Sequence, residues 1–216
     1  MPKTAQTPEQ CRMMEGRSLR RTLLAQVAEE TVKLNKKGIL PSLHVVHVGG
    51  THAGQIYVDA KLRSAKQAGM DANLHALPAD TTQQDLEKLL RTLSDDDAAH
   101  GVLLQLPLPQ QLDTVKALSR IAPIKDVDGL TPENAALLLR GDDSGMKPCT
   151  PMGIMRLLEA YNVEAKGSNA VVLGRSRLVG HPLAEMLTQA GATVTTCHKK
   201  TENLAHYTKQ ADVLAV

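Results

Sequence analysis

Tyr57 and Lys61 form the first pair whose residue types and spacing could do chemistry. They stand four residues apart in a segment, 52–68, that is expected to be helical, so they share one helix face. A partly desolvated lysine beside a phenol can bind a polar substrate and take part in proton transfer. Such pairs are also common on solvated helix surfaces. A site is favoured here because the helix follows Gly49-Gly50, which ends a short β-branched run.

A second group of candidates lies farther along the chain. Gln105 ends an apolar run and precedes Leu106-Pro-Leu-Pro109, so it either satisfies the loop backbone or faces Lys61 across one sheet edge. In Lys125-Asp-Val-Asp-Gly129, Asp126 suits a role in stabilising the turn. Asp128 is the better candidate to contact a ligand that carries N–H donors. No cluster has the spacing of a metal site, so we expect no metal.

A glycine turn opens the last third of the chain. Gly174, Arg175 and Ser176 follow an expected strand and precede an expected helix, 179–190, whose N-terminal N–H groups could receive a phosphate. Ser176 replaces the middle glycine of the usual G-x-G-x-x-G pattern. The next strand ends in a basic turn that contains Lys199, with no acid before Glu202. This favours the 2′-phosphate of NADP over NAD, although a solvated basic turn remains the alternative.

The expected elements alternate between strands and helices, which predicts an α/β fold with parallel sheets. In the first part we expect helices at 18–37, 52–68, 82–93 and 132–139 and strands at 43–48, 70–77 and 101–105. In the second part we expect helices at 151–161, 179–190 and 201–209 and strands at 169–174, 192–197 and 213–216. In the first helix, Leu19, Leu23, Val27 and Leu34, with Leu24 and Ala28 alongside, approximate one apolar face. His44 and His47 are expected to be structural, and 141–145 is the best linker candidate.

The composition excludes several classes of protein. Among 216 residues, 25 basic and 23 acidic side chains give a net charge of +2, so neither nucleic acid nor a membrane surface is an expected partner. No apolar run approaches the length of a membrane span. Three separated cysteines argue against disulfides and favour a reducing cytoplasm. There are three Tyr and no Phe or Trp, so the core must be aliphatic.

These observations predict two domains, 1–147 and 148–216. The second is a Rossmann-like dinucleotide-binding domain that is only partly present, because three strands make half of such a fold. We therefore expect the chain to be a fragment or a natural truncation of a longer protein.

In order along the chain, the motifs resemble one family closely, the bifunctional methylenetetrahydrofolate dehydrogenase/methenyltetrahydrofolate cyclohydrolases. The matching segments are Gln55-Ile-Tyr-Val-Asp-Ala-Lys61, Gly101-Val-Leu-Leu-Gln-Leu-Pro-Leu-Pro109, Lys125-Asp-Val-Asp-Gly129, Pro148-Cys-Thr-Pro151, Val172-Leu-Gly-Arg-Ser-Arg-Leu-Val-Gly180 and Thr193-Val-Thr-Thr-Cys-His198. The likeness runs from about Glu15 to Val216.

The resemblance implies an NADP-dependent oxidation of 5,10-methylenetetrahydrofolate and hydrolysis of the methenyl product to 10-formyltetrahydrofolate. It implies a homodimer and a folate held between the domains. Lys61 would be the catalytic lysine, tuned by Gln105, with Tyr57 against the folate and Asp128 on the pterin. The substrate site so implied comprises Tyr57, Lys61, Leu104, Gln105, Leu106 and Asp128, and the cofactor site comprises Gly174, Arg175, Ser176 and Lys199.

Two departures from the family pattern keep another function open. Gly54 stands where the family commonly has Ser, and the family's glycine- and proline-rich C-terminal segment has no counterpart. The alternative is a catalytically silent remnant that still binds a folate or a nucleotide.

Overall fold

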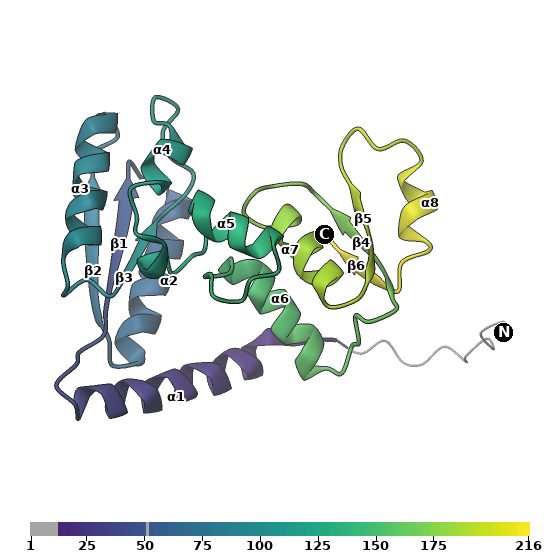
Figure 1. The fold of residues 1–216 in the computed structure, drawn as a ribbon, viewed down its shortest axis with the longest axis horizontal. Coiled ribbons are helices and arrows are strands. Elements are labelled where there is room, and N and C mark those ends of the chain that lie inside the picture. The colour runs from purple at the N-terminus through teal and green to yellow at the C-terminus, as the bar shows by residue number, and fades with distance from the viewer. Residues whose placement is uncertain (1–12, 51) are drawn as a thin grey trace.

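The computed structural model describes residues 13–50 and 52–216, which form two α/β halves side by side (Figure 1). The first half contains a three-stranded sheet, and its main elements alternate as the sequence predicts. They are α1 (Gly16–Asn35), β1 (Ser42–Val48), α2 (His52–Gln67), β2 (Asp71–Leu77), α3 (Gln83–Asp95) and β3 (Gly101–Leu104).

The first sheet has the order β2-β1-β3, and all its strands are parallel. One face carries a core of side chains from β1, β3 and α3, which includes Val46, Leu86, Leu90 and Leu104. The other face packs against α2 through Val58. Because helices cover both faces, the carboxyl ends of β1 and β3 form the edge at which loops can build a site.

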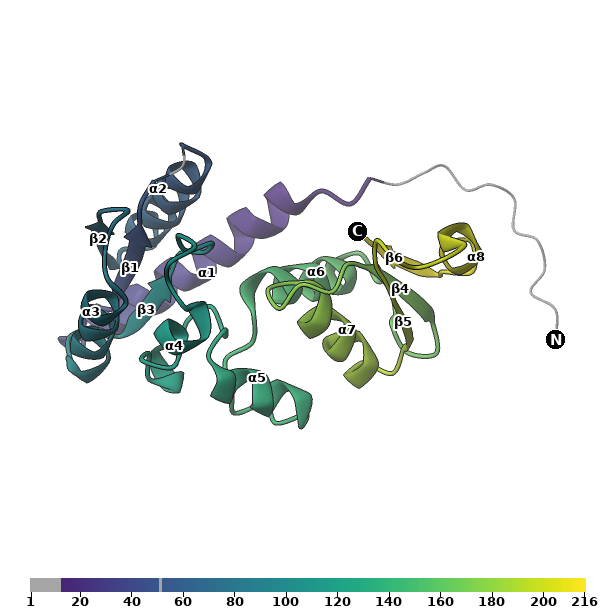
Figure 2. The ribbon, with the colours of Figure 1, turned by 90° about the horizontal axis from the view of Figure 1, so that it is seen from above.

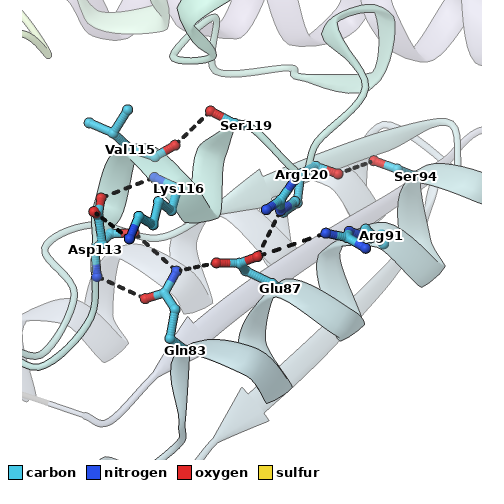
Figure 3. A network of polar contacts seen from close by, with 9 residues as sticks. All are labelled: Gln83, Glu87, Arg91, Ser94, Asp113, Val115, Lys116, Ser119 and Arg120. Atoms are coloured by element: carbon cyan, nitrogen blue, oxygen red, sulfur yellow. Dashed lines mark hydrogen bonds and ion pairs between the residues drawn. The ribbon is translucent and has the colours of Figure 1, made fainter.

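Polar contacts fix α4 (Thr114–Leu118) against α3 (Figure 3). The Asp113 N–H donates to Gln83 Oε1 at 2.8 Å, and Arg120 Nε donates to Glu87 Oε2 at 2.7 Å. Ala117 and Leu118 are buried beneath this network. The loop between β3 and α4, which contains Gln105, is therefore held at both ends.

A buried carboxylate organises the segment after α4. Asp126 is 1% exposed, and its Oδ2 accepts the Thr131 N–H at 2.7 Å and Asn134 Nδ2 at 2.9 Å. Asn134 lies on α5 (Pro132–Leu139), and its Oδ1 accepts the Met146 N–H at 3.1 Å. The segment 141–145 does connect α5 to the next helix, but it packs on α5. A Cβ on Gly145 would lie 2.8 Å from the Leu137 Cβ.

The second half contains α6 (Cys149–Ala160), β4 (Asn169–Leu173), α7 (Gly180–Gln189), β5 (Thr193–Cys197), α8 (Leu204–Thr208) and β6 (Val213–Ala215). Its sheet has the order β5-β4-β6, again with parallel strands. Leu158, Leu183 and Leu187 pack with Val172 in the core between sheet and helices. The helix expected at 201–209 is shorter, at Leu204–Thr208.

The apolar face predicted for α1 is only partly buried. Leu23 and Val27 are each 39% exposed, and the residue that α1 buries is Thr31, which lies against Gly69 at the end of α2. The reason is the course of α1, which runs along the outside of the molecule from α6 toward the first sheet (Figure 2). Within the part of the chain that is described, no helix is both long and apolar enough to cross a membrane.

Candidate active site

Lys61, Gln105 and Asp128 meet at the carboxyl edge of the first sheet. Lys61 comes from α2, and its Nζ donates to Gln105 Oε1 at 3.0 Å. The same Nζ lies 4.0 Å from Asp128 Oδ2, with the two side chains 34% and 23% exposed. A cation, an amide and a carboxylate are thus held together in a half-buried position. There they can bind a polar ring or move a proton.

The amide of Gln105 serves both of the roles that the sequence left open. Its Oε1 accepts from Lys61, while its Nε2 donates to the Leu106 carbonyl oxygen at 2.7 Å. The bond to the loop backbone fixes which end of the amide faces the lysine. Gln105 is positioned because its own N–H donates to the Val46 carbonyl oxygen at 2.8 Å, just past the end of β3.

Asp128 owes its position to a close approach at Gly129. Gly129 has φ +63°, and a Cβ there would lie 2.6 Å from the Lys147 carbonyl carbon. Only glycine lets the segment 146–148 pass so close. That passage brings the first residue of α6, Cys149, to the site.

Cys149 is a site residue for which no role was predicted from the sequence. Its thiol donates to the Val127 carbonyl oxygen at 3.2 Å. Burial, and then the nearby Asp128 carboxylate, raise the pKa of this thiol to about 12. The thiol therefore stays protonated at neutral pH and acts as a hydrogen-bond donor. The available signal was a cysteine that follows a proline at the start of a helix.

Two other predicted substrate residues lie away from this cluster. Tyr57 is 65% exposed on α2, one turn before Lys61, so its ring stands at the rim, open to a ligand. Leu104, expected to bind substrate, is 2% exposed and packs in the core with Val46 and Leu86. It lies on the sheet face that α3 covers, so in the structure it supports the site from below.

Two cavities lie next to the cluster, and Leu106 lines both of them. A cavity of about 310 Å³ is lined by Gln105, Leu106, Gly49 and Gly50, together with His47. His47, expected to be structural, is buried at 7% exposure on β1 and borders this cavity. His44 instead contacts His75, with 2.9 Å between His44 Nδ1 and His75 Nε2. Burial, and then the neighbouring His44, lower the pKa of His75.

A larger cavity of about 770 Å³ lies between the two halves of the chain. The first half contributes Leu106 and Gly129 to its walls, and the second half contributes Pro148, Arg177 and Leu178. Its lining is mostly apolar, and it does not include Lys61, Gln105 or Asp128. The cavity extends from the Gln105 loop to the turn that follows β4.

The turn after β4 is built on two glycines, Gly174 and Gly180, and we call it the glycine cradle. Gly174 adopts φ +127°, and a Cβ on Gly180 would collide with the Gly174 carbonyl oxygen. Ser176 Oγ accepts the N–H groups of Val179 and Gly180 at 3.1 and 3.3 Å. The expected use of the helix N-terminus therefore needs correction. These two N–H groups cap the turn, so a phosphate would meet the turn before them.

Arg175 and Lys199 lie at the same edge of the second sheet. They follow β4 and β5, which are paired, with Leu173 opposite Cys197. Both side chains are exposed and carry positive charge beside the glycine turn. Within the described residues no three His, Cys, Asp or Glu side chains are grouped as a metal site would require. The edge thus fits a dinucleotide with an added phosphate.

Two sequence profiles match the two halves. The catalytic domain of the tetrahydrofolate dehydrogenase/cyclohydrolase family matches residues 14–128, and the NAD(P)-binding domain of that family matches residues 148–216. The bifunctional protein FolD of Campylobacter jejuni subsp. doylei is 42% identical over 204 residues, which are 94% of this chain and 72% of that protein. The bifunctional protein FolD of Burkholderia orbicola is 43% identical over 202 residues, again 94% of this chain and 70% of that protein.

Solved structures give the same assignment. The crystal structure of the bifunctional enzyme FolD from Campylobacter jejuni superimposes with a TM-score of 0.91 at 41% identity, covering 93% of this chain and 71% of that one. The Trypanosoma brucei enzyme, crystallised with NADP and an inhibitor, gives a TM-score of 0.91 at 34% identity, covering 97% and 72%. The chain therefore belongs to the tetrahydrofolate dehydrogenase/cyclohydrolase family.

Proposed function

We propose that the chain oxidises 5,10-methylenetetrahydrofolate to 5,10-methenyltetrahydrofolate with NADP and hydrolyses the product to 10-formyltetrahydrofolate. The observation that carries this proposal is the cluster of Lys61, Gln105 and Asp128, with the 3.0 Å bond between Lys61 and Gln105. Family membership supports it, since similar proteins are described as bifunctional dehydrogenase/cyclohydrolases. The cavity between the halves supports it too, because it adjoins this cluster at Leu106 and Gly129.

The oxidation needs orientation more than acid or base catalysis. The cofactor, when bound, supplies the hydride acceptor. The residues of the chain must hold the one-carbon bridge of the folate against it, and a well-oriented pair of reactants accounts for much of such a rate. We propose that Asp128 holds the N–H groups of the pterin and that Tyr57 lies against its ring. Leu106 would form the apolar wall that keeps water out.

The hydrolysis needs proton transfer, and Lys61 is placed for it. The methenyl substrate carries a positive charge, which an uncharged amine can approach without repulsion. The amine can then accept a proton from the attacking water as the new C–O bond forms. The same proton passes to N5 as the C–N5 bond breaks, while the hydroxyl of the intermediate releases its own proton to solvent and becomes the carbonyl of the formyl group on N10. Gln105 keeps the amine aimed at the reacting carbon throughout.

The basic edge of the second sheet would select NADP. Gly174, Arg175 and Ser176 would hold the phosphates of the dinucleotide, and Arg175 with Lys199 would pair with the 2′-phosphate. The glycine cradle and the positive charge of this edge support that assignment.

Three further features belong to the same proposal. We assign residues 1–147 to folate binding and catalysis and residues 148–216 to NADP binding. We propose that the protein works in the cytoplasm as a homodimer associated through the second domain, as membership of the family suggests. Size-exclusion chromatography with light scattering should give a molar mass about twice the 23.3 kDa of one chain. The mass of a single chain would contradict the dimer.

The central experiment assays the purified chain for both steps. With methylenetetrahydrofolate and NADP it should form NADPH, and with methenyltetrahydrofolate it should lose the methenyl absorbance. Lys61→Met should lower hydrolysis by about 10²–10⁴-fold. Lys66→Met, on the same helix at an exposed position, is the control and should leave the rate unchanged.

The alternative of a silent remnant predicts a different outcome. A folate or NADP would still bind, as measured by calorimetry, but the wild-type chain would turn over neither substrate. Equal hydrolysis by the wild type and Lys61→Met would remove Lys61 from the mechanism.

A further inference from the structure

Helix α1 joins the two halves from outside the core. It runs along the molecule with its first turn near α6 and its last turns near α2 (Figures 1 and 2). Thr31 is the residue that it buries, and most of its other side chains are exposed. A helix with so little buried surface must be held by individual contacts, and two of these lie toward its N-terminal end.

The first contact ties α1 to the second half. The Glu15 N–H, at the N-cap of α1, donates to the Tyr161 Oη at 2.8 Å, and that hydroxyl lies 3.4 Å from the Glu15 carbonyl oxygen. Tyr161 follows the last residue of α6. Because Glu15 has no side-chain cap of its own, the phenol takes over part of the capping of α1.

The second contact ties α1 to the helix that carries the catalytic lysine. Arg20 Nη2 donates to Ser64 Oγ at 2.8 Å. Ser64 lies three residues after Lys61 on α2 and donates to the Ala60 carbonyl oxygen at 2.8 Å. A path of contacts therefore runs from Tyr161 through α1 to the back of the helix that carries the site.

Helix α6 closes this path on the other side. Its first residue, Cys149, contacts Val127 next to Asp128, and Tyr161 follows its last residue. The three helices α6, α1 and α2 thus form a frame with the Lys61 cluster at one corner and Tyr161 at another. A change at Tyr161 can alter how the second half sits against the first without touching the cluster.

We propose that Tyr161 is a positioning residue which, through α1, sets the alignment of the NADP-binding half against the folate-binding half. This inference rests on the proposed function. Oxidation needs the folate, held by the first half, to be aligned with NADP, held by the second half. Hydrolysis uses Lys61, Gln105 and Asp128, which all belong to the first half. Loss of the Tyr161 hydroxyl should therefore impair oxidation selectively.

The test compares both activities in Tyr161→Phe. A misplacement of about 1 Å can cost on the order of 100-fold in rate, so loss of this one contact should lower kcat for oxidation by about tenfold. The kcat for hydrolysis, and the KM for the methenyl substrate, should stay within about twofold. Tyr207→Phe is the matched control, since Tyr207 lies on α8 against His206, away from α1. It should leave both activities unchanged.

A second variant breaks the frame at another point. Arg20→Met removes the bond to Ser64 and should give the same selective loss, so the test does not depend on the folding of a single variant. Equal losses of both activities in Tyr161→Phe and Arg20→Met would indicate general destabilisation and overturn the proposal. So would full oxidation activity in both variants.

Hydrogen exchange tests the contact between Tyr161 and Glu15, called the tie, without an activity assay. The amide of Glu15 should exchange faster by on the order of tenfold in Tyr161→Phe than in wild type, with no change in β1. Unchanged exchange at Glu15 would overturn the tie itself. If the wild type shows neither activity, the proposed function fails, while the exchange result still decides whether Tyr161 holds α1.

Discussion

At the residue scale, hydrogen bonds restrict the side chains of the site to few orientations. The amide of Gln105 is bonded at both ends, to Lys61 and to the Leu106 carbonyl oxygen. A buried network beneath Asp128 leaves its loop little freedom. Preorganised polar groups of this kind need little rearrangement when charge develops on a substrate.

Gln105→Leu tests that preorganisation. The variant keeps the volume of the side chain but removes the acceptor for Lys61 and the donor to the loop. Hydrolysis of methenyltetrahydrofolate should slow by about 10–100-fold, since the amine is no longer aimed by a hydrogen bond. A stopped-flow assay of the methenyl absorbance measures this. Gln111→Leu, an exposed glutamine on the same loop, is the control, and an equal loss in that variant would contradict the assignment.

The double variant Arg175→Ala, Lys199→Ala tests cofactor choice. Removing both positive charges should weaken NADP binding by at least about tenfold while NAD binding changes little, because only NADP carries the 2′-phosphate. Calorimetric titration of each dinucleotide gives the two dissociation constants. Equal losses for NADP and NAD would show that these side chains do not read the 2′-phosphate.

At the element scale, packing between segments decides where the site residues point. Helix α6 reaches the site only because Gly129 lets the chain before it pass close by. Helix α4 is held on α3 by the network of Figure 3, which keeps the Gln105 loop in place. Each of these two contacts can be removed by one substitution.

Gly129→Ala should destabilise the fold strongly. A methyl group there would press on the backbone of Lys147 and Pro148 in a left-handed conformation, at a cost of about 2–4 kcal/mol. Gly153→Ala is a matched control in α6, where a Cβ meets nothing within 4 Å and should add about 0.5–1 kcal/mol of stability. Urea unfolding of both variants measures the difference. A Gly129→Ala protein as stable as wild type would show that the segment can move aside.

Glu87 gives the α3–α4 contact a dependence on pH. Hydrogen bonds from Gln83 and then Arg120 lower the pKa of the Glu87 carboxyl below its ordinary value of 4.5. A carboxyl with a depressed folded pKa stabilises the protein above pH 4.5, and this contribution is lost as the pH falls through the folded value. Glu87→Gln should therefore be less stable than wild type at pH 7, and the difference in stability should shrink as the pH falls below 4.5.

Thermal melts across this pH range test the assignment. Gln83→Leu, which removes the main donor, should show a smaller version of the same effect. If the difference in melting temperature between wild type and Glu87→Gln stays constant from pH 7 to pH 3, the titration of Glu87 is not its cause.

At the scale of the whole molecule, the two halves should respond together to ligand. Saturation with NADP at 100 times its dissociation constant adds about 2.7 kcal/mol to the free energy of unfolding. Because α1, the Gly129 contact and the Gln189 bond to the Leu138 carbonyl oxygen link the halves, the whole chain should melt in one transition that rises by about 5–10 °C. Two transitions in calorimetry, with only one moved by NADP, would contradict this coupling.

The local elements were predictable from the sequence, and their assembly was less so. Periodicity and glycine stops predicted every strand to within about two residues, because these signals are local. The same signal predicted an apolar face on α1, of which Leu23 and Val27 stay exposed because the helix runs along the outside of the molecule. Leu104 was expected at the substrate, although the alternation of strand faces put it in the core. Cys149 reaches the site only through the Gly129 approach, which no local pattern reveals.

The placement of the tyrosines has an optical consequence. With no tryptophan in the chain, ultraviolet emission comes from Tyr57, Tyr161 and Tyr207 alone. These three phenols lie at the rim of the site, at the tie to α1 and on the outlying α8. Variants that keep one tyrosine at a time would therefore report folate binding, the seating of α1 and the state of α8 as three separate fluorescence signals, with no label attached.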